Sequence, residues 1–194
     1  MLVSDSEVRQ PFFRAAQIPN LICVLRMALV WPIIYTLAAG RYGLALGLVA
    51  VAGISDGLDG FLAKRFDWRS RLGGLLDPLA DKLLLVSTFV TLAYLGLAPV
   101  WLTVVVMLRD FIIVTGGVAY QAVVGKVEPE PSAVSKLNTG AQLLFVCAVI
   151  AHRAFDVPPS EWITAIGATV FVTASVSGLD YVLRWSWKAV RARR

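Results

Sequence analysis

The chain has 194 residues, of which 58% are hydrophobic and only 16% are charged, and its formal net charge is +5. A mean hydropathy of +0.73 excludes an ordinary soluble globular domain and indicates a single integral membrane domain over residues 1–194. The basic residues are divided among short loops and the C-terminal end, so anionic lipid headgroups are favoured over nucleic acid as partners.

The N-terminal residues 1–18 lack the apolar stretch of a secretory signal. We interpret them either as a short amphipathic segment along the membrane surface or as a solvated tail. The first apolar run follows, from Leu21 to Ala39, and its one charged residue is Arg26. A charge within a spanning helix is costly unless it faces the protein interior or reaches the headgroups.

Four aspartates stand at the edges of the second and third apolar runs, within the stretch DGLDGFLAKRFDWRSRLGGLLDPLAD of residues 56–81. On helices, Asp56 and Asp59 share one face, and Asp77 and Asp81 share another. Packing these helices together would gather four carboxylates in one volume, where unpaired anions at membrane depth are very unfavourable. Oxygen ligands without cysteine or histidine suit hard cations, so the pattern predicts two Mg²⁺ or Mn²⁺ ions.

Small residues accompany these acids. Gly60 and Ala63 continue the first acidic stripe, and Gly73 precedes the second, so a diphosphate group can approach the backbone closely. The second apolar run, Tyr42 to about Ala63, leads into a loop with four basic residues at 64–71. This charge predicts a cytoplasmic loop, and therefore a site that opens to the cytoplasm.

The stretch 56–81 resembles the pattern D-x-x-D-G-x-x-A-R-x8-G-x3-D-x3-D of the CDP-alcohol phosphatidyltransferase family, with every spacing kept. The pattern has arginine where this chain has Lys64, and Arg65 follows at once, so either side chain is a candidate for that role. The resemblance implies CDP-diacylglycerol as the phosphatidyl donor and a homodimer. It also implies that Asp81 is the general base that deprotonates the acceptor hydroxyl.

The first apolar run adds to this resemblance, because it opens like the family's P-N-x-x-T-x-x-R, with Cys23 in place of threonine. Asn20 and Arg26 match that opening and are predicted to help seat the nucleotide or its phosphates; interfacial anchoring is the alternative. The donor site implied by the family comprises Asn20, Arg26, Asp59, Gly60, Ala63, Lys64, Arg65 and Gly73.

The next uncharged stretch runs from Leu83 to Leu108 and is too long for one span. Counted from Gly74 to Val124, it predicts the third and fourth helices, with an outer turn near residues 96–99. Arg109 then lies midway along the fourth helix, next to Asp110. Arg109 either pairs structurally with an aspartate or lies near the cleft and touches an acceptor phosphate.

A polar break at residues 125–131 is predicted to return the chain to the cytoplasm, and residues 135–139 lead into a fifth helix over 140–151. Phosphatidylglycerophosphate synthases of the family resemble G-K-x-K-T here, with two lysines suited to a phosphate. This chain keeps Lys136 and Thr139 but has Asn138 at the second lysine. S-K-x-N-T resembles the eukaryotic-type cardiolipin synthases, whose acceptor is phosphatidylglycerol. The predicted acceptor site is therefore Arg109, Lys136, Asn138 and Thr139.

The last outer loop is predicted around residues 152–159, where His152 lies too far from the aspartates to suggest catalysis. A sixth run, Trp162 to Leu183, contains Asp180, and Arg184 follows four residues later as a helical partner. Residues 184–194 form a basic tail, predicted to be cytoplasmic. The predicted fold is all-α, with six transmembrane helices after a short interfacial segment and with both termini in the cytoplasm.

The predicted function is metal-dependent transfer of a phosphatidyl group from CDP-diacylglycerol to an alcohol, with release of CMP. Phosphatidylglycerol is the favoured acceptor and gives cardiolipin; glycerol 3-phosphate is the alternative. A transporter with an acidic ion path is a hypothesis of another class, although the aspartates cluster at one mouth and no inverted repeat is seen. A non-catalytic assembly protein is a third. The N-terminal segment leaves no room for a long transit peptide, which favours a bacterial inner membrane.

Overall fold

The computed structural model describes residues 18–66, 73–124 and 133–192, and it describes side chains for residues 22–56, 80, 82–116 and 134–181. Within these ranges the chain forms six helices and no strand. The helices are α1 (Ile18–Ala38), α2 (Tyr42–Phe66), α3 (Gly73–Tyr94), α4 (Val100–Val124), α5 (Ala133–Phe155) and α6 (Ser160–Ala192). The all-helical prediction is therefore confirmed.

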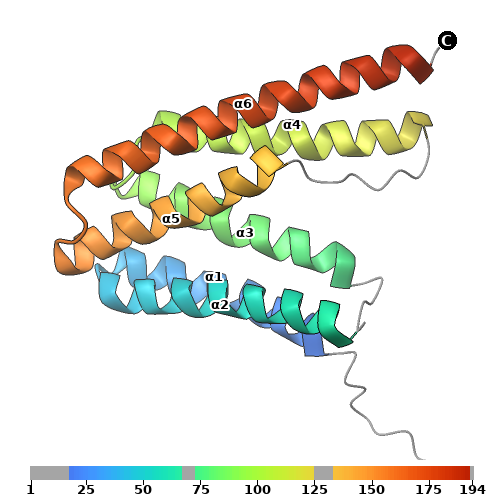
Figure 1. The fold of residues 1–194 in the computed structure, drawn as a ribbon. Coiled ribbons are helices and arrows are strands. Elements are labelled where there is room, and N and C mark those ends of the chain that lie inside the picture. Colours follow the sequence, from blue (N-terminus) through green and yellow to red (C-terminus); the bar gives the residue numbers. More distant parts are fainter. Residues whose placement is uncertain (1–17, 67–72, 125–132, 193–194) are drawn as a thin grey trace, which may run out of the picture.

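The helices form a closed ring in which spatial order differs from chain order (Figure 1). Going round the ring, α1 contacts α2, α2 contacts α5, α5 contacts α6, α6 contacts α4, α4 contacts α3, and α3 contacts α1. In addition, α3 touches α5 across the middle. Short turns at one end join α1 to α2, α3 to α4 and α5 to α6, so that end holds three tight connections.

Two of these turns are closed by glycines in the left-handed region, Gly40 (φ 70°) and Gly96 (φ 69°). The amide of Gly96 donates to the carbonyl of Ala93 at 3.0 Å, and the amide of Leu97 donates to that of Leu92 at 2.8 Å. This pairing caps the last carbonyls of α3, and glycine is favoured because a side chain would be strained at that φ. The predicted turn near residues 96–99 is thus confirmed, while its placement on the outer side stays a prediction.

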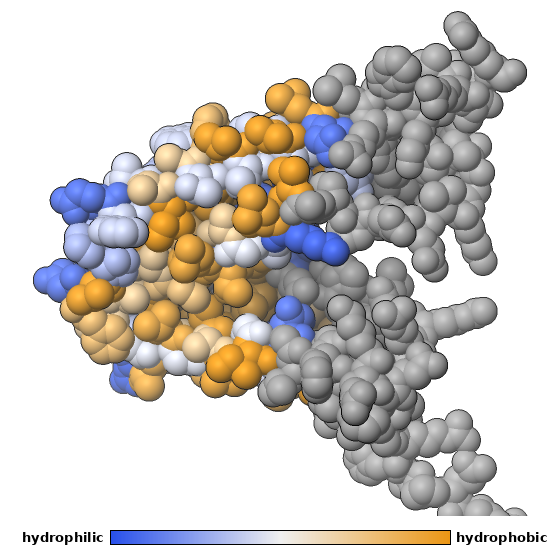
Figure 2. Space-filling model, viewed as in Figure 1, coloured by the Kyte–Doolittle hydropathy of each residue, from blue (hydrophilic) through white to orange (hydrophobic). Residues whose placement is uncertain are grey.

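The centre of the bundle is apolar and aromatic. Phe89 of α3 stacks on Phe145 of α5 with ring centroids 5.7 Å apart, and Leu92, Leu102 and Ile150 are buried around the bundle axis. Apolar side chains also cover much of the outside, where hydrophilic residues gather near one end and beside the undescribed part (Figure 2). Such a surface is unusual for a soluble protein but suits contact with lipid.

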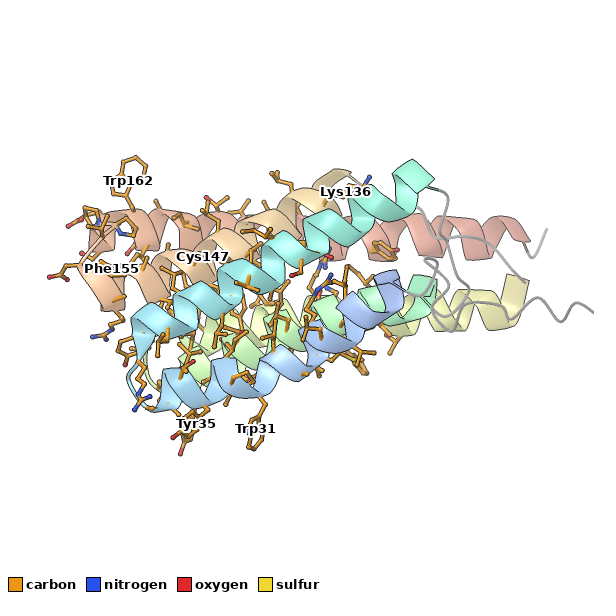
Figure 3. All side chains as sticks on the ribbon, turned by 90° about the horizontal axis from the view of Figure 1, so that it is seen from below. Trp31, Tyr35, Lys136, Cys147, Phe155 and Trp162 are labelled. Carbon is orange, nitrogen blue, oxygen red and sulfur yellow. The ribbon has the colours of Figure 1, made fainter. Side chains whose placement is uncertain are left out.

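Among the described residues, two segments are long and apolar enough to cross a membrane, Val134–Phe155 and Ser160–Tyr181. Shorter apolar stretches lie in α1, α2 and α3. Large aromatic side chains point away from the bundle at Trp31, Tyr35 and Trp162 (Figure 3). Amphipathic rings of this kind are typical of the edges of a bilayer.

The fifth and sixth helices are longer than predicted. α5 begins at Ala133, so residues 135–139 form its first turns and do not precede it, and His152 lies in its last turn and not in the outer loop. α6 continues to Ala192, so most of the predicted basic tail is helical. Polar residues lie beyond the apolar pattern in both places, but polarity alone does not end a helix, and α5 continues through Gly140.

The Phe89–Phe145 stack generates a test of the core. Phe89→Ala should lower the free energy of unfolding in detergent by about 1 to 3 kcal/mol, because it leaves a cavity between α3 and α5. Thermal unfolding measures this change. Tyr94→Ala, on the same helix but 89% exposed, is the matched control and should change the midpoint little. Equal effects of the two substitutions would contradict the packing described above.

Candidate active site

An ion pair between α1 and α2 marks one side of the site. The Nη1 atom of Arg26 lies 2.7 Å from the Oδ1 atom of Asp56. The Arg26 side chain is fully buried, whereas that of Asp56 is 48% exposed. Arg26 therefore reaches the carboxylate from inside the bundle and leaves its outer edge accessible. A buried guanidinium requires such a partner, because an unpaired charge in apolar surroundings is very costly.

Beside this pair lies an open hollow of about 60 Å³. Polar groups from Arg26, Asp56 and Thr139 stand among walls that are otherwise apolar. The remaining lining residues come from α2, α3 and α5 and are Ala52, Gly53, Leu84, Leu85 and Leu143. The hollow thus joins a charged group to apolar surroundings, as a site for a lipid with a charged headgroup requires.

The other predicted aspartates lie on the two helices that border this hollow. Asp59 belongs to α2, while Asp77 and Asp81 belong to α3, but their side chains fall outside the described residues. The same holds for most of the predicted donor site, namely Asn20, Gly60, Ala63, Lys64, Arg65 and Gly73. Asp56 and Arg26 are thus the part of this site whose geometry is described.

The packing of the aspartate-bearing parts of α2 and α3 lies outside the described side chains and stays a prediction; the contacts between helices are described for the rest. There α2 and α3 each pack against α1, and they face each other across the hollow without direct contact. Ala52 and Gly53 of α2 and Leu84 and Leu85 of α3 line this hollow, so both helices contribute to its wall.

A second charged cluster ties four helices together around Arg109. Its Nη1 atom donates to the Oδ1 atom of Asp110 at 2.6 Å, and the Lys82 ammonium of α3 contacts the same oxygen. Its Nη2 atom donates to the hydroxyl of Ser135 on α5, and to that of Ser177 on α6 at 2.9 Å. Arg109 is only 4% exposed. The structural pairing that the sequence left open is therefore present, while a contact with an acceptor stays a prediction.

The acceptor residues predicted on α5 occupy three different environments. Lys136 is exposed and lies toward the end of the bundle away from Phe155 and Trp162 (Figure 3). Thr139 lines the hollow. Asn138 is fully buried, and its Oδ1 atom accepts a hydrogen bond of 2.9 Å from Thr173 of α6.

Sequence reasoning missed several polar residues of this region: Lys82, Ser135, Gln142, Thr173 and Ser177. Gln142 is fully buried one turn beyond Asn138. A signal was available, because Ser135, Asn138 and Gln142 follow helical spacing along one face of α5. Ser177 and Thr173 carry the same spacing on α6. His152, in contrast, contacts the carbonyl of Pro158 at 2.8 Å at the far end of α5, which agrees with its exclusion from the site.

The donor chemistry of the site fits a hard divalent cation as far as it is described. Asp56 offers an accessible carboxylate edge, and carboxylate oxygens are the ligands that Mg²⁺ and Mn²⁺ prefer. Among the described side chains, no group of three acidic, histidine or cysteine residues comes together. The remaining three aspartates belong to the undescribed side chains, so the four-aspartate metal site stays a prediction.

These features define an all-helical protein with a largely apolar exterior and an ion pair at the edge of a hollow. The chain belongs to the CDP-alcohol phosphatidyltransferase family, whose sequence profile matches residues 16–175. This range contains every lining residue of the hollow and, apart from Ser177, the Arg109 cluster.

The proteins similar to this chain include enzymes with two different named activities. Human cardiolipin synthase (CMP-forming) is 32% identical over 180 residues, which are 84% of this chain and 60% of the human protein. The CDP-diacylglycerol–glycerol-3-phosphate 3-phosphatidyltransferase of Bacillus subtilis is 33% identical over 150 residues, 74% of each chain. Cardiolipin synthase (CMP-forming) of Streptomyces coelicolor is 40% identical over 114 residues, 56% of this chain and 53% of the relative. The chain thus spans about three fifths of the human relative.

The Arg109 cluster generates a test of stability. Asp110→Asn should destabilise the protein by about 3 kcal/mol, because it leaves two buried or half-buried cations without their shared carboxylate. Thermal unfolding in detergent measures the loss. Adding Lys82→Met removes one of these cations and should restore part of the stability. An additive double variant, as unstable as the sum of the single changes, would contradict the coupling.

Proposed function

We propose that this protein transfers the phosphatidyl group of CDP-diacylglycerol to an alcohol acceptor and releases CMP. The observation that carries the proposal is the Arg26–Asp56 pair at the edge of a hollow whose walls are otherwise apolar. A lipid with a diphosphate headgroup matches both the charged and the apolar part. The family to which the chain belongs, and the names of its relatives, support the same reaction.

Phosphatidylglycerol is the acceptor that we favour, which makes cardiolipin the product. Asn138, a neutral and fully buried residue, stands where a second lysine would suit a phosphate monoester. The phosphate of phosphatidylglycerol is a diester with a single negative charge, so it needs fewer cations than glycerol 3-phosphate does. Lys136 and Arg109 are the proposed partners of that phosphate. Glycerol 3-phosphate remains the second candidate, because a relative of that activity covers much of the chain.

The proposed metal ligands are Asp56, Asp59, Asp77 and Asp81. When bound there, divalent cations supply Lewis acidity and neutralise charge on the CMP leaving group. Arg26 holds the Asp56 carboxylate by one oxygen and keeps the other edge turned outward. Asp81 is proposed to take the proton of the acceptor hydroxyl, whose oxygen forms the new bond to the β-phosphorus as the bond to CMP breaks.

All six helices are proposed to cross the membrane. The cleft and the helix ends that lead into the two longer connections, α2 to α3 and α4 to α5, are proposed to lie on the cytoplasmic side. The basic loop at residues 64–71 and the basic residues after 183 support this orientation. The tight turns would then lie on the opposite side. A homodimer is proposed from the family resemblance.

A direct assay tests the proposed function. Purified protein in detergent should release CMP from CDP-diacylglycerol when Mg²⁺ or Mn²⁺ is present, and a chelator should abolish the release. Phosphatidylglycerol and glycerol 3-phosphate, offered in separate reactions, identify the acceptor. Turnover with glycerol 3-phosphate alone would move the assignment to phosphatidylglycerophosphate synthesis. Metal-dependent ion flux without CMP release would instead favour the transporter hypothesis.

The role of Asp81 generates a further prediction. Asp81→Asn should lower kcat by about 10² to 10⁴, because the amide cannot accept the acceptor's proton. Initial rates of CMP release measure this loss. Asp156→Asn is the matched control: Asp156 is an exposed residue of the α5–α6 turn with φ 59°, where asparagine is well tolerated. Full turnover by the Asp81 variant would exclude Asp81 as the general base.

A further inference from the structure

Gln142 of α5 is an unusual residue for the centre of this bundle. Its side chain is fully buried, and neither its Oε1 nor its Nε2 atom has a hydrogen-bond partner within the described part of the chain. A carboxamide carries two donor hydrogens and an acceptor oxygen, and burying them unpaired in apolar surroundings is costly. Leucine or methionine would fill the same space without that cost. The unpaired amide therefore points to a polar group supplied by a ligand.

The position of Gln142 relates it to the acceptor side of the cleft. It follows Asn138 by four residues, which is about 6 Å along the helix axis, on the same buried face. The Nδ2 atom of Asn138 is also buried without a partner in the described structure, although its Oδ1 atom is bonded to Thr173. On the same turn of α5, Thr139 and Leu143 line the hollow. Gln142 thus directly precedes a lining residue of the hollow, on the helix that carries the predicted acceptor residues.

The chemistry of a carboxamide narrows the class of ligand. A phosphate only accepts hydrogen bonds, so it would leave the Gln142 carbonyl unpaired. An alcohol hydroxyl both donates and accepts, and can pair with either end of the amide. Each acceptor considered above contains a glycerol unit in which one primary hydroxyl reacts and one secondary hydroxyl does not. The secondary hydroxyl is a group of the required chemistry next to the reacting one.

We propose that Gln142 binds the non-reacting secondary hydroxyl of the glycerol unit in the acceptor, and so selects glycerol-type alcohols. This inference rests on the proposed function and holds for phosphatidylglycerol and glycerol 3-phosphate alike. The amide is positioned by α5, one turn deeper than Asn138. A buried polar group left unpaired by the wrong substrate discriminates strongly, because its desolvation is no longer compensated.

The experiment compares each acceptor with an analogue that lacks only the secondary hydroxyl, phosphatidyl-1,3-propanediol or 3-hydroxypropyl phosphate. The unmodified protein should prefer the glycerol form by about tenfold to a hundredfold in kcat/KM. In Gln142→Met the ratio of kcat/KM for the glycerol form to kcat/KM for the analogue should fall close to one, while KM for CDP-diacylglycerol stays unchanged. Ile150→Met, a buried volume-conserving change two turns further along α5, is the control and should keep the preference.

Stability separates a ligand-binding role from a structural one. Gln142→Met should unfold at the same temperature as the unmodified protein or higher, because it removes an unpaired buried amide. If Gln142→Met keeps the preference for the glycerol-type acceptor, whatever its unfolding temperature, the inference is overturned. CMP release would in that case still support the proposed function. Equal use of both acceptors by the unmodified protein would overturn the inference without any variant. No turnover with any acceptor would overturn both.

Discussion

A buried charge in an apolar bundle must be paired, and this constraint organises the protein. Arg26 and Arg109 are both nearly inaccessible, and each meets a carboxylate, Asp56 and Asp110 respectively. Arg109 also donates hydrogen bonds to the hydroxyls of Ser135 on α5 and Ser177 on α6. The Arg26–Asp56 pair joins α1 to α2, whereas Arg109 and Asp110 are neighbours on α4 and join it to α3, α5 and α6 through Lys82, Ser135 and Ser177. The cost of breaking such pairs gives the bundle a defined register that apolar packing alone would specify less strictly.

The two buried arginines belong to two separate polar regions of the bundle. On the side of α1 and α2, Arg26 holds Asp56 at the edge of the hollow. Around α4, α5 and α6, cations and hydroxyls form a connected network. α3 touches both, since its leucines line the hollow and Lys82 contacts Asp110. α3 therefore links the two polar regions.

Neutral polar residues complete this arrangement beneath the charges. Asn138 has one partner on α6, whereas the Gln142 amide has none in the described structure. A buried amide requires a hydrogen-bond partner, and the inference above assigns that partner to the acceptor. The apolar core around Phe89 and Phe145 lies deeper and holds the walls in place.

The sequence by itself determined the helical class, the turn near Gly96, the acidic motif and the family, because hydropathy and residue spacing are local properties. It left the role of Arg109 open, and it predicted α5 and α6 shorter than they are. Only the tertiary structure decided the ring order, the Arg26–Asp56 pair and the separation of α2 from α3 by a hollow. It alone revealed Lys82, Ser177 and Gln142 as interior groups. Contacts between distant segments depend on how whole helices pack, and the spacing of residues along one helix does not encode its neighbours.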